Sequence, residues 1–125
     1  MSAGSKSSPI PSPPIKRVEK PWGHEQWLVV GQRVVMKRLV VERGHRLSLQ
    51  YHEKKEEAWL LVRGRARVRY GDAEGEIEAG RVVYLPAGTV HRIEALEDLE
   101  LLEVSTPELD DVVRLEDDFG RKGER

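Results

Sequence analysis

The sequence predicts an all-β domain, a sandwich or a barrel, on two observations. Short apolar runs alternate with turn residues along most of the chain, and no long segment keeps a helical period. The runs that we expect to form strands are residues 26–30, 34–41, 58–62, 66–70, 81–85 and 99–104. Glycines and a Pro-Ala-Gly turn fall between these runs. Many short strands at fairly regular spacing are typical of a closed or two-layered β-structure.

The two ends of the chain differ from this pattern. Residues 1–16 (MSAGSKSSPIPSPPIK) are mostly serine, proline and lysine, and such a composition buries too little apolar surface to offset the entropy of ordering. We therefore predict a disordered tail over 1–16, or alternatively an extended arm that docks on a partner subunit, followed by a barrel domain over 17–121. The stretch 107–120 is where we expect a helical turn or two.

Composition narrows the possible functions. The 125 residues suit one domain, and the net charge of −1 indicates neither a nucleic acid nor an anionic membrane as partner. Alternating arginines at 63, 65, 67 and 69 are interpreted as a solvated outer face of a strand. The chain has no cysteine, so a metal would need nitrogen and oxygen ligands. No apolar run reaches the ~20 residues of a membrane span, and no signal core is seen; we expect a cytoplasmic protein.

Polar side chains are predicted to point into the barrel. Gln50 and His52 are two residues apart, so on a strand they face the same side. Glu57 stands two and four residues before Trp59 and Leu61, which are core residues by type, and should face inward with them. A buried carboxylate is costly unless it is paired or binds a metal.

A second histidine, His91, follows the turn at 86–88. The predicted metal ligands are Gln50, His52, Glu57 and His91. Two imidazoles, a carboxylate and an amide oxygen suit one divalent first-row ion, and zinc, manganese, iron, cobalt and nickel are not distinguished by them.

These residues also carry a family resemblance. Residues 44–64 (GHRLSLQYHEKKEEAWLLVRG) resemble the first cupin motif, with Gln50 in place of its usual first histidine. Residues 80–91 (GRVVYLPAGTVH) resemble the second cupin motif. The resemblance implies a single cupin barrel, a double-stranded β-helix of the jelly-roll type.

The resemblance extends in order over residues 16–121 to the type II phosphomannose isomerase domain. That domain commonly forms the C-terminal part of bifunctional mannose-1-phosphate guanylyltransferase/mannose-6-phosphate isomerases. The matching segments are KPWG at 20–23, MKRL at 36–39, LSLQYH at 47–52, EAW at 57–59, LEV at 102–104 and DDVVRLEDDFGR at 110–121. No counterpart of the nucleotidyltransferase half is seen. At 53–55 the sequence Glu-Lys-Lys replaces the histidines and arginine frequent in the family.

The resemblance implies a metal-dependent isomerase that interconverts mannose 6-phosphate and fructose 6-phosphate through an enediol. A metal would polarise the carbonyl, and a base would move the proton between C1 and C2. Position in the matching segments makes Lys37, Lys55 and Glu103 the catalytic candidates, because Glu57 is compromised as a base if it binds metal.

The substrate's phosphate needs a cation. Lys37 and Arg38 are neighbours on a predicted strand, so only one faces the barrel, and we predict that Arg38 binds the phosphate. We also predict that Tyr51 contacts the substrate, and that Arg114 attaches the acidic tail to the barrel.

Other classes of function stay open at this point. A cupin with much the same ligands could be an iron-dependent oxygenase, although an amide oxygen donates less to iron than an imidazole does. A sugar- or metal-binding cupin without catalysis is the other alternative, because fold does not fix function. By analogy with cupins we expect a homodimer.

Overall fold

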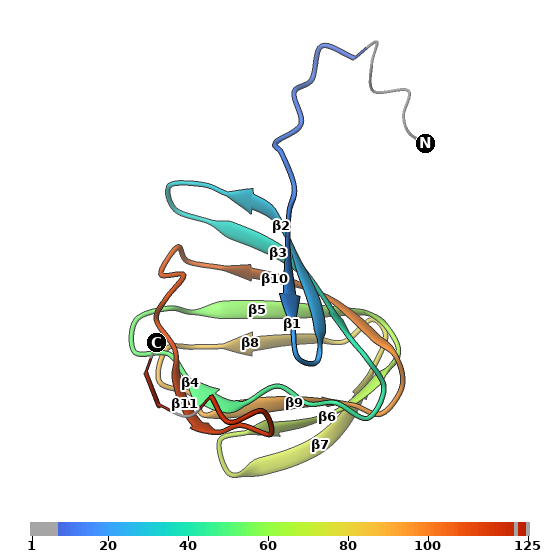
Figure 1. Cartoon of the computed structure of the whole chain (residues 1–125), viewed down its shortest axis with the longest axis vertical. Helices are drawn as coiled ribbons and strands as arrows, with labels where there is room; N and C mark the ends of the chain where they lie inside the picture. Colours follow the sequence, from blue (N-terminus) through green and yellow to red (C-terminus); the bar gives the residue numbers. More distant parts are fainter. Residues whose placement is uncertain (1–7, 122, 125) are drawn as a thin grey trace.

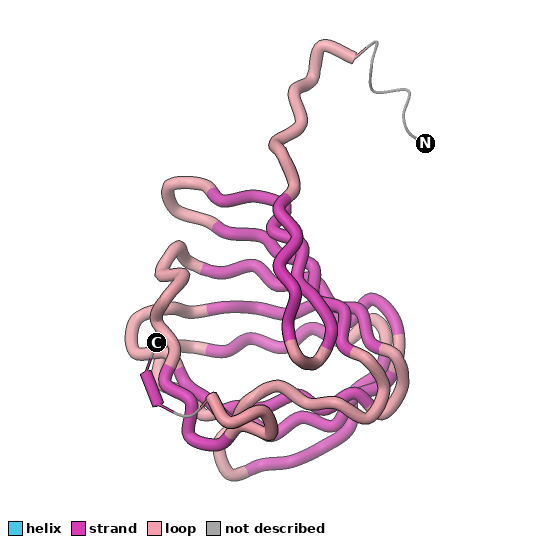
Figure 2. Tube along the Cα trace, viewed as in Figure 1, coloured by secondary structure: helices cyan, strands magenta, loops and turns pink. Residues whose placement is uncertain are grey.

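The computed structural model describes residues 8–121 and 123–124. These residues form twelve strands and no helix (Figures 1 and 2). The strands are β1 Lys16–Lys20, β2 Gly23–Val30, β3 Val35–Val41, β4 Leu49–Tyr51, β5 Glu57–Arg63, β6 Arg65–Tyr70, β7 Ala73–Glu78, β8 Val82–Leu85, β9 His91–Ala95, β10 Leu99–Ser105, β11 Val113–Glu116 and β12 Gly123–Glu124.

The strands make two six-stranded antiparallel sheets that face each other. One sheet has the order β1-β2-β3-β10-β5-β8 and the other β12-β11-β4-β9-β6-β7. In Figure 1 the first sheet forms the upper and middle rows of arrows, and the second closes the barrel below it. The predicted all-β barrel is confirmed. All six predicted strands are present, with ends shifted by up to three residues.

Strand alternation decides what enters the barrel. Along β3 the buried residues are Val35, Lys37, Leu39 and Val41, with half-buried residues between them. The apolar core contains twelve buried side chains: Trp22, Leu39, Val41, Trp59, Leu61, Ala66, Val68, Leu85, Ile93, Ala95, Leu99 and Leu101. Side chains on a strand alternate between its two faces, and Lys37 is in step with Val35, Leu39 and Val41. Lys37 therefore points into the barrel together with these core residues.

Strand register then gathers the polar residues. Lys37 on β3 lies opposite Glu103 on β10, and Glu103 lies opposite Trp59 on β5. Two residues further along β3, Leu39 lies opposite Leu101, which lies opposite Leu61. Polar side chains are therefore set beside an apolar row, so one end of the interior can hold charge while the other is hydrocarbon.

The predicted helical turn in 107–120 is wrong. Residues 113–116 form β11, which pairs with β4 so that Val113 lies opposite Tyr51 and Arg114 opposite Gln50. The backbone N–H and C=O groups on the edge of β4 need hydrogen-bond partners, and β11 supplies them. This pairing between distant segments outweighs the weak local preference for a helical turn. The register shifts between Arg114 and Glu116.

The N-terminal segment 8–15 is exposed, contains no strand and runs away from the barrel (Figure 1). Residues 1–7 lie outside the described part, so the predicted disorder of 1–16 stays a prediction; the final residue, Lys16, begins β1. None of the described residues belongs to a helix long and apolar enough to cross a membrane.

The outer face of β5 and β8 is apolar. Leu60, Val62, Val82 and Tyr84 are all more than a third exposed, and Leu60 lies directly opposite Val82. The expected homodimer stays a prediction, and this face is where apolar contact with another chain could form.

Gly64, between β5 and β6, should resist substitution. Its φ is +95°, and a Cβ there would lie 2.3 Å from the carbonyl oxygen of Asp98. We expect Gly64→Ala to lower the free energy of unfolding by about 2–4 kcal/mol, measured by urea denaturation. Gly71→Ala is the matched control, because Gly71 has φ +60° and open space around it, and should cost about 1 kcal/mol. Equal losses would contradict the proposed backbone clash.

Candidate metal centre and cavity

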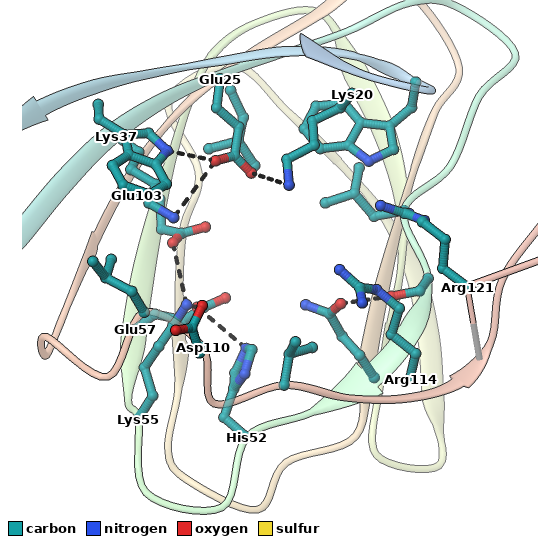
Figure 3. A pocket seen from close by; sticks show the side chains of 18 residues that line it. Lys20, Glu25, Lys37, His52, Lys55, Glu57, Glu103, Asp110, Arg114 and Arg121 are labelled. Atoms are coloured by element: carbon teal, nitrogen blue, oxygen red, sulfur yellow. Dashed lines mark hydrogen bonds and ion pairs between the residues drawn. The ribbon is translucent and has the colours of Figure 1, made fainter. Parts of the chain in front are cut away.

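A polar cavity lies between the two sheets at the end of the barrel where the charged rows lie. It holds about 710 Å³ of empty space, including solvent at its mouth, and residues from both sheets and from the C-terminal segment line it. Figure 3 shows its wall, with Glu25, Lys37, Lys55, Glu57 and Glu103 on one side of the opening. A small neighbouring cavity includes His91 and shares Gln50 and Glu57 with the first.

Three buried side chains meet in this region as a candidate metal centre. His52, Glu57 and His91 each offer a ligand atom, and these atoms all lie within 4.8 Å of one another. The distances are 3.4 Å from His52 Nε2 to Glu57 Oε2 and 3.6 Å from His91 Nε2 to Glu57 Oε1. Ligand atoms that share an ion at ~2.1 Å are spaced by about 3–3.5 Å, so little movement is needed to bind one.

The Nδ1 atom of each imidazole already makes a hydrogen bond to a backbone carbonyl. His52 Nδ1 donates to the carbonyl oxygen of Asp111 at 2.6 Å, and His91 Nδ1 donates to that of Thr89 at 2.9 Å. A carbonyl can only accept, so in the neutral imidazole the proton is on Nδ1 and the lone pair is on Nε2. Both Nε2 atoms are buried and make no hydrogen bond. Burial also lowers the pKa of His91, against the opposing effect of Glu57. These residues fit a divalent cation.

Asp111 holds the loop that carries His52. Its carboxylate accepts hydrogen bonds from the backbone N–H groups of Glu53, Lys54 and Lys55, at 3.0, 2.7 and 2.8 Å. Partial burial alone would raise the pKa of Asp111, but these three donors lower it. Asp111, in the C-terminal segment, therefore orients both His52 and Lys55.

Gln50, the fourth predicted ligand, is close to the group but otherwise engaged. It lies directly opposite His91 across β4 and β9, and it lines both cavities. Its Oε1 accepts a hydrogen bond from Ser48 Oγ at 2.6 Å. The oxygen keeps a second lone pair, and its role as a ligand stays a prediction.

All three catalytic candidates are buried in the cavity wall: Lys37, Lys55 and Glu103. Lys55 Nζ lies between two carboxylates, 3.3 Å from Glu57 and 3.7 Å from Glu103. Burial would lower the pKa of Lys55, but Glu103 and Glu57 together raise it. Burial, reinforced by the negative charge of Glu57, raises the pKa of Glu103 to about 7. A carboxyl group that titrates near neutrality can both accept and return a proton.

Glu57 is the opposite case. Burial alone would raise its pKa, but the close approach of His52 and the charge of Lys55 lower it to about 2. Its Oε1 also accepts from Trp59 Nε1 at 3.1 Å. The two neighbouring carboxyl groups are thus set for different tasks: Glu57 stays ionised and Glu103 titrates.

Two predicted substrate residues are not in the cavity wall. Arg38 faces outward, where it hydrogen bonds Gln26 at 3.1 Å and lies 3.2 Å from Glu100. Alternation along β3 turns Lys37 inward and so excludes Arg38. Tyr51 follows the lining residue Gln50 on β4 and is not a lining residue itself. The structure thus places Arg38 and Tyr51 outside the cavity wall, and their contacts with phosphate and substrate stay predictions.

Sequence reasoning missed several lining residues. Glu25 accepts from Trp27 Nε1 at 2.8 Å and lies 3.5 Å from Lys37 Nζ, which also lies over the Trp27 ring. The alternation of β2 could have placed Glu25 inside, had the strand been extended back to Gly23. The cationic lining residues Lys20, Arg114 and Arg121 belong to segments that looked like peripheral chain ends, and Arg114 was expected only to attach the tail.

A two-sheet antiparallel barrel with two histidines and a carboxylate around one interior point defines the class: a β-barrel protein of the cupin fold with a metal-type site. Solved structures agree on the fold. KdgF from Halomonas sp. superposes with a TM-score of 0.70 at 18% identity, over 76% of this chain and 90% of that one. A cupin superfamily protein from Desulfitobacterium hafniense has a TM-score of 0.61 at 18% identity, over 66% of this chain and 74% of that one.

Sequence comparison then gives the family. Residues 14–117 match the family described as "Mannose-6-phosphate isomerase C-terminal", and the chain belongs to it. The xanthan biosynthesis protein XanB of Xanthomonas campestris pv. campestris (strain B100) is 38% identical, covering 85% of this chain and 24% of that protein. Mannose-1-phosphate guanylyltransferase ManC of Salmonella typhimurium is 37% identical, covering 85% and 23%. The chain thus spans about a quarter of the length of these relatives.

Removing one imidazole should remove the metal site. We expect His91→Ala to lose stoichiometric binding of zinc or manganese, measured by elemental analysis after dialysis, because two ligands rarely hold such an ion. His45→Ala is the matched control, since His45 lies outside both cavities beside Phe119 and Glu42. Circular dichroism should show both variants folded. Unchanged metal content in His91→Ala would refute the ligand set.

Glu103 should give the metal-free protein a pH-dependent stability. Its pKa rises from 4.5 to about 7 on folding, so between these values the native state holds a proton that the unfolded chain has released. The free energy of unfolding should therefore fall as pH rises through this window, by up to ~3 kcal/mol, and level off above it.

This slope can be assigned by urea denaturation in chelator between about pH 5 and pH 8. Glu103→Gln should abolish it. Glu100→Gln should keep it, because Glu100 is on the outward face of the same strand beside Arg38. A slope that survives in Glu103→Gln would exclude this carboxyl as its source.

Proposed function

We propose that this chain is a metal-dependent aldose–ketose isomerase of hexose phosphates, and that it interconverts mannose 6-phosphate and fructose 6-phosphate. The observation that carries the proposal is that a cation site and a carboxyl group able to carry a proton lie next to each other at one cavity. A buried cation site, formed by His52, Glu57 and His91, adjoins a buried carboxyl group, Glu103, whose pKa is about 7. Isomerisation between C1 and C2 needs both an electrophile at the oxygens and a proton carrier at the carbons.

A divalent ion held by His52, Glu57 and His91 would supply a Lewis acid for the sugar's carbonyl oxygen. Glu103 would take the proton from C2 of the aldose and return it to C1, while the proton of the O2 hydroxyl passes to O1. The atoms balance without any further reactant. Lys55, 3.7 Å from Glu103, would hold the carboxylate in place when it is ionised.

The surrounding residues support this division of work. Lys37 is held by Glu25 at 3.5 Å and lies opposite Glu103 on the next strand, which places a second ammonium group beside the proton carrier. Family membership adds support, although the relatives' printed activities belong to proteins about four times longer than the region matched.

A coupled isomerase assay with mannose 6-phosphate tests the proposal. Activity should disappear with chelator and return with a divalent metal. Glu103→Gln should lower kcat by about 10²-fold or more with metal content unchanged, as for loss of a general acid–base group. Glu100→Gln is the matched control on the outward face of β10 and should keep full activity.

Two results would overturn this function. Stoichiometric metal binding without turnover of any hexose phosphate would favour a sugar- or metal-binding cupin without catalysis. Oxygen uptake by the iron-loaded protein, without isomerisation, would favour an oxygenase.

A further inference from the structure

We infer that the cavity has a second, cationic side, formed by Lys20, Arg114 and Arg121, which binds the phosphate group of the substrate. This phosphate subsite rests on the proposed function for its role in turnover, but it can be tested by anion binding alone. All three residues line the same cavity as His52, Glu57 and Glu103.

The charges are separated across the cavity. Figure 3 shows Arg114 and Arg121 projecting into the opening from the side opposite His52, Lys55 and Glu57. The carboxylates Glu25, Glu57 and Glu103 all belong to β2, β5 and β10 of one sheet. Lys37 and Lys55 on that side are already paired with these carboxylates, whereas the guanidinium groups opposite can attract a dianionic phosphate. Charge alone therefore favours one orientation of the substrate.

Arg121 is fixed in place for such a role. Asp117 accepts from its Nε and its Nη2, each at 2.9 Å, and also from its backbone N–H at 2.8 Å. The Asp117 side chain is completely buried in this contact, and Arg121 is further packed against the Phe119 ring. A guanidinium has five N–H donors, so this clamp uses two and leaves the Nη1 group for a ligand. Asp117 is thus a positioning residue.

Arg114 is placed by strand register. It lies opposite Gln50 on β4, and Gln50 lies opposite His91 on β9. Opposed residues of paired strands project to the same face, and each strand step is about 4.8 Å, so the backbones of Arg114 and His91 are roughly 10 Å apart. This spacing leaves room for the sugar chain between a phosphate at Arg114 and reacting carbons near the metal centre.

Lys20 completes this side from the other end of the chain. It ends β1 and lines the cavity, where its Nζ lies 4.0 Å from Glu25 Oε2. Two arginines and a lysine offer the bidentate and point-charge contacts that phosphate groups prefer. Arg38, the phosphate residue expected from sequence, lies on the outer face and is the natural control.

The first test is anion binding without turnover. Inorganic phosphate is titrated into the metal-loaded protein and into the chelator-treated protein, followed by ³¹P NMR. Wild type should bind in both states, whereas Arg114→Gln and Arg121→Gln should each weaken binding about tenfold or more. Arg38→Gln should bind as wild type does. Equal affinity in all four proteins would overturn the subsite.

The second test is kinetic and separates the two proposals. In Arg114→Gln and Arg121→Gln, KM for mannose 6-phosphate should rise at least tenfold, while turnover of unphosphorylated mannose stays as in wild type. Phosphate binding that depends on these arginines in a protein without isomerase activity would refute the proposed function and keep the subsite. Full activity with unchanged KM in both variants would refute the subsite alone.

A third variant guards against misfolding. Either arginine substitution could loosen the C-terminal segment, so Lys20→Met, on a different segment, is measured in parallel, with circular dichroism as the check of folding. A folded Lys20→Met protein should also bind phosphate more weakly. Unaltered binding in this variant would remove Lys20 from the subsite.

Discussion

The structure depends on one constraint: several charged side chains must be buried inside a small β-barrel, and each must be compensated there. Burying an isolated charge is far more costly than the net stability of a domain this size. Lys55 bridges Glu57 and Glu103, and Lys37 is paired with Glu25. The two imidazoles turn bare nitrogens toward Glu57. A site compensated in this way is also a site with perturbed acids and an open place for a cation.

Strand pairing produces that compensation. The ladders of β3, β10 and β5 bring Lys37, Glu103 and Trp59 into one row, although they are far apart in the sequence. A shift by one residue would turn each of them to solvent and expose the buried apolar row beside them. The core residues Leu39, Leu101 and Leu61 therefore fix the register that the charged residues need.

Features that depend on the pattern of neighbouring residues could be predicted from the sequence, whereas features that depend on pairing between distant segments could not. Local alternation was enough to place Gln50, His52 and Glu57 inside and to predict six strands. Alternation alone could not decide which of the neighbours Lys37 and Arg38 faces the barrel, and the structure turns Lys37 inward. The positions of β11 and Arg114 depended on pairing with β4, which no local pattern encodes, because a short acidic stretch suits a helical turn equally well.

The attachment of Asp111 to the 52–55 loop has a consequence for biogenesis. The histidine and lysine on that loop are oriented by a residue synthesised much later, and the clamp between Asp117 and Arg121 is nearer still to the end of the chain. During translation the barrel strands through β10 can pair while this segment is still inside the ribosome. The nascent domain would then have a folded core but an unfinished polar cavity, completed only when residues 111–121 emerge and dock.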